Sequence, residues 1–289
     1  MEPSHLVNPL ATSSQLETSA SQIDELPRDL EYSIRYESSR LNQAAGMLLR
    51  LPQEIIAQSI VILQRCWAGE HGISILKQDP KDTAAAALYL TAKPSTHSIS
   101  PRQLLTVFDF LNNLKGDYTG YAAGDDPKQS TWTLSESEYE SRRECLYATE
   151  AVLLRTLGFD THVALPYTLC INYLQTLEAF DGPESPSLAR RVFSHLNSAL
   201  SSPQRLYLTH QPCVLATASI YLAAREIGFS LPDVEWWEVF DVDREELGFL
   251  VVALRSLEGF VEEEKATWAN TKVPLTVKAL RAYIAQLNA

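Results

Sequence analysis

Apolar residues recur at helical spacing along most of the chain, and no segment shows the strict alternation typical of a half-buried strand. The clearest pattern is DPKDTAAAALYLTAK, residues 79–93, in which residues 84–90 are all apolar. A helix that is apolar on every side lies in a core or a membrane, and this run is too short to span a bilayer. The pattern therefore predicts a buried central helix in an all-α protein.

Residues at both ends of this stretch favour a helix of that length. Asp79 can cap the first turn, and Pro80 stands at a position where a helix does not need an N–H group. Lys93 places a cation where the apolar helix reaches the surface, and Pro94 ends the helix.

Further helices are predicted on both sides of this stretch, separated by proline, glycine or polar turns. Before residue 160 they cover 27–50, 52–67, a segment that begins at Pro101, and 138–157. After it they cover about 164–180, 187–201, 212–226, 233–240 and 243–265. With the central helix, the chain is predicted to hold two successive sets of five helices.

Three stretches lack a helical period. Residues 1–26 are rich in small polar residues and predict a disordered N-terminal tail. Residues 115–137 contain three glycines among Asp, Ser and Thr, and they predict an inserted loop. Residues 266–289 predict a C-terminal tail with a short helix. The predicted domains are therefore 27–160, which includes the loop, and 161–265.

An internal repeat relates the two sets of helices. Shifting the sequence by 132 positions places QPCVLATASIYLAAR on DPKDTAAAALYLTAK, so that Pro212 aligns with Pro80. In the same alignment Arg225 takes the place of Lys93. Because the helix count also repeats, duplication explains this match better than chance, and each set is predicted to wrap around its third helix.

Composition and charge narrow the class of function. The chain has 45% hydrophobic residues, as soluble globular proteins do, and it shows neither a secretory signal nor a transmembrane run, so we expect an intracellular protein without a membrane partner. The net charge of −12 argues against a nucleic-acid-binding surface spread over the whole protein. Eleven acidic residues fall within 233–264, against two arginines. Such a run is most simply a solvated helical face, with an interaction surface as the alternative.

The sequence offers no catalytic or metal-binding motif. It contains no glycine-rich phosphate loop, GxSxG or HExxH, and its six histidines are scattered singly. The four cysteines lie far apart without a CxxC pair and are predicted to be buried free thiols. We therefore expect a protein that is not an enzyme and has no metal or cofactor.

Two charged residues stand at apolar positions. Glu150 falls within the leucine stripe of the helix at 138–157, and no residue three or four positions away is cationic. Lys93 likewise has no anion at these spacings. Since a half-buried charge without a partner is costly, the two residues have a physical reason to meet. The alternative is that Lys93 complements the C-terminus of its own helix while Glu150 reaches solvent.

Three stretches carry a resemblance to a known family. They are LNQAAGMLLRLPQEIIAQSIVILQRCW at 41–67, YATEAVLLRTLGFDTHVALPY at 147–167 and IYLAAREIGFSLP at 220–232. Together with the doubled five-helix pattern, they resemble the cyclins, and more narrowly the transcription- and splicing-associated cyclins of the L, K and T type. The resemblance covers roughly residues 27–265 and implies an all-α fold of two tandem five-helix cyclin-box repeats.

The resemblance also implies a function. Cyclins are regulatory, activating subunits of cyclin-dependent protein serine/threonine kinases, here one acting in RNA polymerase II transcription or RNA processing, and hence a nuclear protein. In cyclins the residues that match Lys93 and Glu150 form a pair that binds the C-helix region of the kinase N-lobe. The adjoining apolar groove would be lined by Leu90, Leu154, Phe159 and, where another apolar residue is expected, Pro94. No direct contact with nucleic acid is expected.

The chain departs from the cyclin pattern at two places. Family members usually follow the helix-ending lysine with an apolar residue and two acidic ones, whereas Lys93 is followed by PST. The loop at 115–137 is also longer than the family norm. The alternative function is a tandem cyclin-fold transcription adaptor of the initiation factor IIB type that binds DNA or a scaffold, and the acidic second repeat weighs against it.

Overall fold

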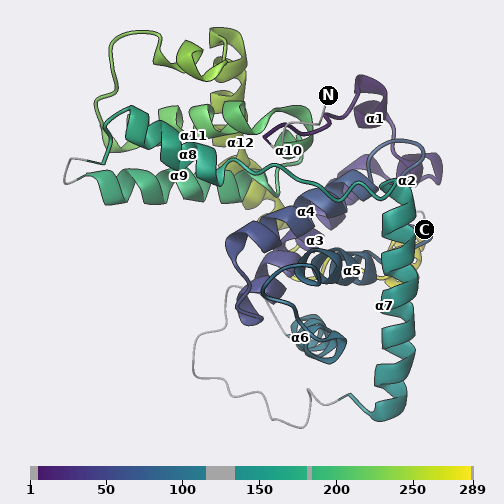
Figure 1. The fold of residues 1–289 in the computed structure, drawn as a ribbon. Coiled ribbons are helices and arrows are strands. Elements are labelled where there is room, and N and C mark those ends of the chain that lie inside the picture. The colour runs from purple at the N-terminus through teal and green to yellow at the C-terminus, as the bar shows by residue number, and fades with distance from the viewer. Residues whose placement is uncertain (1–5, 115–133, 181–183, 288–289) are drawn as a thin grey trace. The chain divides into compact units, whose positions relative to one another are not determined.

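The computed structural model describes residues 6–114, 134–180 and 184–287 of the 289-residue chain. In these ranges the regular elements are helices, so the predicted all-α class is confirmed (Figure 1). The elements are α1 (Ser13–Glu17), α2 (Ala20–Ile23), α3 (Arg28–Leu48), α4 (Gln53–Cys66), α5 (Pro80–Ala92), α6 (Pro101–Asn113), α7 (Glu136–Thr156), α8 (Tyr167–Thr176), α9 (Ser185–Ala199), α10 (Leu206–Thr209), α11 (Pro212–Ile227), the 3₁₀ helix η2 (Trp236–Phe240), α12 (Arg244–Thr267) and α13 (Val277–Leu287).

The chain divides into two compact units. The first-repeat unit comprises residues 12–161 and 273–289, and the second-repeat unit comprises residues 1–11 and 162–272. Each unit therefore takes in part of both segments that the sequence assigned to terminal tails. Of the predicted loop at 115–137, residues 115–133 lie outside the described residues, and Glu136 already begins α7.

The first-repeat unit is built around α5. Helices α3, α4, α6 and α7 all pack against α5, and residues 84–88 of α5 are at most 4% exposed, which confirms the buried central helix (Figure 1). The alanines allow this close approach because a methyl group leaves room for a second helix. At one end Pro80 occupies the first turn as predicted, and at the other Lys93 follows the last helical residue.

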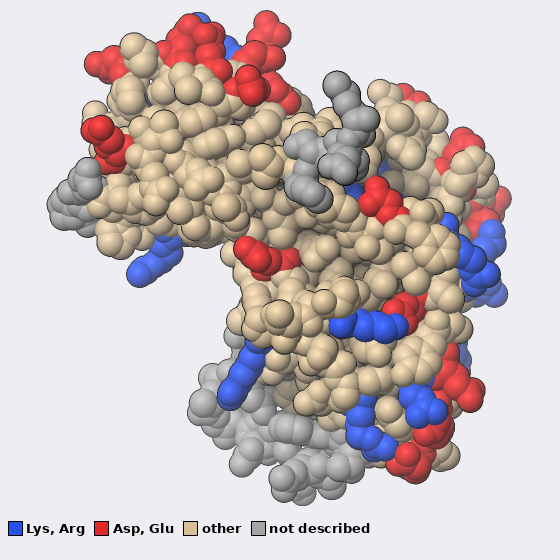
Figure 2. All heavy atoms as spheres, viewed as in Figure 1, with Lys and Arg blue, Asp and Glu red and all other residues tan. Residues whose placement is uncertain are grey.

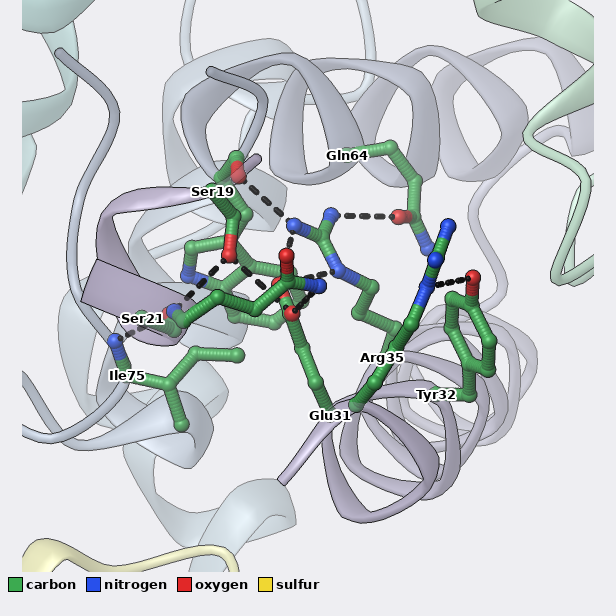
Figure 3. A network of polar contacts seen from close by, with 10 residues as sticks. Ser19, Ser21, Glu31, Tyr32, Arg35, Gln64 and Ile75 are labelled. Atoms are coloured by element: carbon green, nitrogen blue, oxygen red, sulfur yellow. Dashed lines mark hydrogen bonds and ion pairs between the residues drawn. The ribbon is translucent and has the colours of Figure 1, made fainter. Parts of the chain in front are cut away.

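The N-terminal segment of this unit differs from the predicted disordered tail. It forms α1 and α2, and the Ser19 hydroxyl and the Gln22 amide donate hydrogen bonds to Glu31 Oε2 at 3.0 and 2.8 Å. Glu31, only 1% exposed, also pairs with Arg35 Nη2 through Oε1 at 2.6 Å. Arg35 donates in turn to Gln64 Oε1 at 3.2 Å and to a backbone carbonyl at the end of α4 (Figure 3). This buried charge network fastens residues 12–26 to α3 and α4.

The C-terminal segment also belongs to this unit. The Asp79 side chain makes no cap bond to its own helix, contrary to the sequence prediction, and its Oδ1 instead accepts from the N–H of Val277 at 2.7 Å. The N–H of Lys81 donates to the carbonyl of Leu275 at 3.2 Å, and Leu280 on α13 is fully buried. The short helix predicted in the C-terminal tail is thus α13, and it completes the first-repeat unit.

The second-repeat unit repeats the plan around α11, against which α8, α9, α12 and η2 pack. The predicted helix at 233–240 is a shorter 3₁₀ helix, and α10 was not predicted. The Glu226 carboxylate accepts from Arg191 Nε at 2.5 Å and lies 2.9 Å from His195 Nε2, so α11 is tied to α9. Burial raises the pKa of Glu226, but the hydrogen bonds from Arg191 and His195 lower it more, and the net pKa lies below the ordinary value.

Acidic residues from 233 to 246, in the second-repeat unit, are almost all exposed. Figure 2 shows acidic side chains over this part of the drawn face, with few basic ones among them. None of the described helices has both the length and the apolar character required to cross a bilayer.

The four cysteines are free, as predicted, but only two of them are buried. Cys66 and Cys170 lie in the core, whereas Cys213 is half-buried and Cys145 is exposed on α7. The prediction of a buried thiol was therefore wrong for Cys145, whose exposed side chain lies beside Asp82.

Candidate kinase-binding site

The two isolated charges predicted from the sequence meet in the structure. Lys93 Nζ lies 3.1 Å from Glu150 Oε1 and 3.4 Å from Oε2. Helices α5 and α7 pack against each other, which carries the end of α5 to the inner stripe of α7. The alternative in which Lys93 and Glu150 stay apart is therefore wrong.

The pair is unequally buried. The Glu150 side chain is 9% exposed, whereas that of Lys93 is 55% exposed. An ammonium group has three donors, and Glu150 supplies acceptors from one side only, so Lys93 can still offer donors to a partner. The geometry is that of an anchored cation: a nearly buried carboxylate holds an ammonium group at the surface.

Two tyrosine rings lie close to the pair. Lys93 Nζ lies 5.5 Å from the centre of the Tyr89 ring, one helical turn earlier, and the Tyr89 and Tyr147 rings are 6.2 Å apart. Burial, followed by the effects of Tyr147 and Glu150, raises the pKa of Tyr89 to about 12, so the phenol stays neutral near pH 7. The sequence interpretation missed Tyr89, although an aromatic residue four positions before a lysine on a helix is a recognisable cation–π spacing.

The remaining predicted site residues lie on the same two helices or directly after them. Leu90 on α5 and Leu154 on α7 are half-buried, and Pro94 is exposed immediately after Lys93. Phe159 follows the end of α7 and is 70% exposed.

The backbone at the end of α7 holds Phe159 in an unusual conformation. Gly158 and Phe159 both have positive φ, +59° and +64°, and the Phe159 N–H donates to the carbonyl of Leu154 at 2.8 Å. A left-handed conformation costs a non-glycine residue on the order of 1–3 kcal/mol. Phe159 thus combines a left-handed backbone with a side chain that is largely exposed to water.

No group of three or more His, Cys, Asp and Glu residues in the described ranges is placed to hold a metal ion. What the first-repeat unit presents is a surface with an anchored cation and exposed apolar groups.

The tandem helical fold has counterparts among solved structures. A chain in the crystal structure of the yeast RNA Pol II CTD kinase CTDK-1 complex superposes with a TM-score of 0.68 at 12% identity, covering 98% of this chain and 84% of that one. A chain in the structure of the CAK complex of Chaetomium thermophilum bound to ATP-gamma-S gives a TM-score of 0.60 at 17% identity, covering 94% and 85%. At such identities these structures establish the tandem helical fold alone, and the predicted cyclin-type fold is confirmed.

Sequence relatives narrow the resemblance. The chain is 29% identical to Cyclin-L2 of Homo sapiens over 272 residues and 29% identical to Cyclin-L1 of Danio rerio over 241 residues. It is 30% identical to Cyclin-L1-1 of Arabidopsis thaliana over 235 residues. These alignments cover 90%, 83% and 80% of this chain but 49%, 45% and 51% of the relatives, so the chain spans about half the length of the curated relatives it matches. No family model matches. The predicted resemblance to the L-type cyclins is thus confirmed.

Proposed function

We propose that this chain is the regulatory, activating subunit of a cyclin-dependent protein serine/threonine kinase that acts in RNA polymerase II transcription or RNA processing. The observation that carries the proposal is the Lys93–Glu150 pair, held 3.1 Å apart with Lys93 half-exposed. The similarity to L-type cyclins supports the kinase class and a nuclear location.

The proposed mechanism is positional. A protein kinase of this type must pair its N-lobe lysine with a glutamate on its C-helix before the ATP phosphates are held correctly. Lys93 and Glu150 would bind the backbone at the C-helix region, and Leu90, Pro94, Leu154 and Phe159 would form the apolar surface beside them. The bound helix is then pressed inward. This chain would contribute binding energy and no catalytic group.

Truncation of either member of the pair tests the proposal. Removing one partner from a hydrogen-bonded charge pair at an interface costs about 2–5 kcal/mol, or roughly thirty- to several-thousand-fold in affinity. Lys93→Ala and Glu150→Ala should each weaken binding to the kinase that co-purifies with the tagged chain. The double variant should lose less than the sum, since both residues serve one contact. Titration calorimetry gives the affinities, and circular dichroism checks the helical content.

Arg225→Ala is the matched control, because Arg225 aligns with Lys93, is exposed and carries the same charge. It should leave kinase affinity unchanged, since the second repeat has no counterpart of Glu150. If Lys93→Ala and Glu150→Ala each reduce the free energy of kinase binding by less than about 0.5 kcal/mol, the two residues behave as ordinary surface charges. That result would overturn the proposal.

The second candidate is an adaptor of the initiation factor IIB type that binds DNA. The exposed acidic residues of the second-repeat unit disfavour it, since a phosphate backbone requires basic side chains. Salt-dependent retardation of duplex DNA in a gel shift, with no kinase among the co-purified proteins, would favour the adaptor.

A further inference from the structure

A small cavity of about 120 Å³ lies in the first-repeat unit, where the N-terminal part of α5 meets α6 and α7. Its apolar walls come from Ala85, Leu105, Phe108 and Leu146. Pockets for drug-sized ligands measure about 300–1,000 Å³, so this cavity suits a single side chain. None of the residues proposed for kinase binding lines it.

Charged side chains stand around the cavity, and one carboxylate among them lacks a strong partner. Arg142 Nη1 is bound to Asp109 Oδ1 at 2.5 Å, so these two charges satisfy each other. Asp82 has only the weak thiol donor of Cys145, whose Sγ is 3.7 Å from Oδ2, and no ion pair to Asp82 occurs within the described part of the chain. Burial raises the pKa of Asp82, which the charge of Lys81 partly offsets. A half-buried carboxylate in this setting is stabilised by any cation that reaches it.

The cations Lys81 and Arg142 also line the cavity, but the backbone beside it offers few free donors to an anion. The N–H groups at the start of α5, which could otherwise bind an anion, are already used: that of Lys81 donates to Leu275, and those of Asp82 and Thr83 donate to the carbonyl of Asp79. Arg142 is occupied by Asp109. Of the two carboxylates that line the cavity, Asp109 has an ion pair and Asp82 has none among the described residues.

We propose that this cavity binds a basic side chain, arginine or lysine, from a partner protein. The aliphatic stem would lie against Leu105, Phe108 and Leu146, and the cationic head would reach Asp82. A long basic side chain has this division into an apolar stem and a charged end, which matches apolar walls beside a carboxylate. A guanidinium could also donate to both oxygens of Asp82 at once.

Cys145 supplies a direct readout because its thiol borders both the cavity and Asp82 and is exposed. The probe is N-butylguanidinium, with neutral N-butylurea as the isosteric control and butyrate as the anionic control. The measured quantity is the rate of Cys145 alkylation by iodoacetamide, followed by peptide mass spectrometry in mildly alkaline buffer. Burial and the nearby Asp82 raise the pKa of the Cys145 thiol, so the reaction is slow enough to follow.

N-butylguanidinium should protect Cys145 in a saturable way, and N-butylurea and butyrate should not. Asp82→Asn should weaken the protection at least tenfold. Asp29→Asn is the matched control: it removes the same charge from an exposed position in the first turn of α3 and should leave protection unchanged.

The proposal is overturned if N-butylurea protects as well as the cation, because the cavity is then merely apolar, or if butyrate protects better. The variant Cys145→Leu narrows the cavity and should hinder binding of the probe. Because it lacks the thiol, binding of N-butylguanidinium to this variant is followed by the NMR chemical shifts of the Leu105 methyl groups. If N-butylguanidinium changes the Leu105 methyl shifts equally in Cys145→Leu and in the wild type, the probe binds outside the cavity. That result would also overturn the proposal. None of these outcomes depends on kinase binding, so this test and the test of the proposed function can fail separately.

Discussion

Removing the carboxylate of Glu31 should destabilise the first-repeat unit strongly. Glu31 is 1% exposed and accepts four hydrogen bonds, two from Arg35, one from Ser19 and one from Gln22. In Glu31→Ala, Arg35 keeps the acceptors Gln64 Oε1 and the Trp67 carbonyl but loses its counter-ion (Figure 3). Because Arg35 is only 5% exposed, water cannot replace that counter-ion.

The magnitude follows from burial. Breaking a buried ion pair by removing one partner costs about 3–5 kcal/mol, because the other charge stays in a medium that solvates it poorly. For a chain of this size each kcal/mol lowers Tm by about 2–4 °C, so the expected fall is about 6–20 °C. Arg35→Met should cost somewhat less, since Ser19 and Gln22 still donate to the Glu31 carboxylate.

The assay is a double-mutant cycle measured by urea unfolding. The cycle uses Glu31→Leu, Arg35→Met and the double variant, which replaces the pair by apolar groups. The double variant should cost clearly less than the sum of these two single variants, as is often observed for buried pairs. Limited proteolysis gives a second readout: residues 12–26 lose an anchor in Glu31→Ala and should be cleaved faster at low protease concentration.

The reasoning fails if Glu31→Ala lowers Tm by less than about 2 °C, the shift expected of an ordinary surface substitution. Additive losses in the cycle would also contradict it, because the two side chains would then contribute independently.

Two further predictions concern other parts of the chain. Gly46→Ala should cost about 1–3 kcal/mol in urea unfolding, since an added Cβ would lie 2.4 Å from Ile56 Cγ1, whereas the control Gly248→Ala, with nothing within 4 Å, should not destabilise. The pKa of Glu226 is lowered in the folded state, so its stabilising contribution is present above the unfolded pKa and is lost as pH falls through the folded pKa. Glu226→Gln should therefore be less stable than the wild type near neutral pH, and this difference should shrink as the pH falls through the lowered pKa of Glu226. A difference that stays unchanged in acid would show that the ionised carboxylate does not contribute to stability.

The Lys93–Glu150 contact could be predicted because each residue conflicts with its own helix. A charge within an apolar stripe can be recognised from the residues of one helical turn. Because Lys93 and Glu150 carry opposite charges and each lacks a local partner, an ion pair between them is the simplest way to stabilise both. The central helix was predictable for the same reason, since the pattern of residues 84–90 is local. Phe159 is different: the resemblance to cyclins indicated its role, and only the structure shows its exposure and positive φ.

The two terminal segments were not predictable from local pattern. Helices α1 and α2 have five and four residues, too short for a periodic signal, and polar side chains hold them in place. A signal did exist, because Glu31 and Arg35 stand four apart beside Leu30 and Ile34, which are buried. The role of Asp79 had no local signal, since its partner lies 198 residues away.

Because Asp79 binds Val277 near the end of the chain, the first-repeat unit can be completed only late in synthesis. The first-repeat unit begins at residue 12 but needs α13, so about 110 residues of the second-repeat unit are synthesised before it can be completed. At a translation rate of about 5–20 residues per second this delay amounts to roughly 6–22 s. During this time Leu280 has not yet packed against the rest of the first-repeat unit. Throughout that interval the N-terminal end of α5 lacks its hydrogen bonds to residues 275–277. A fragment that stops at the second repeat would lack these hydrogen bonds permanently, so an expression fragment should extend to residue 287.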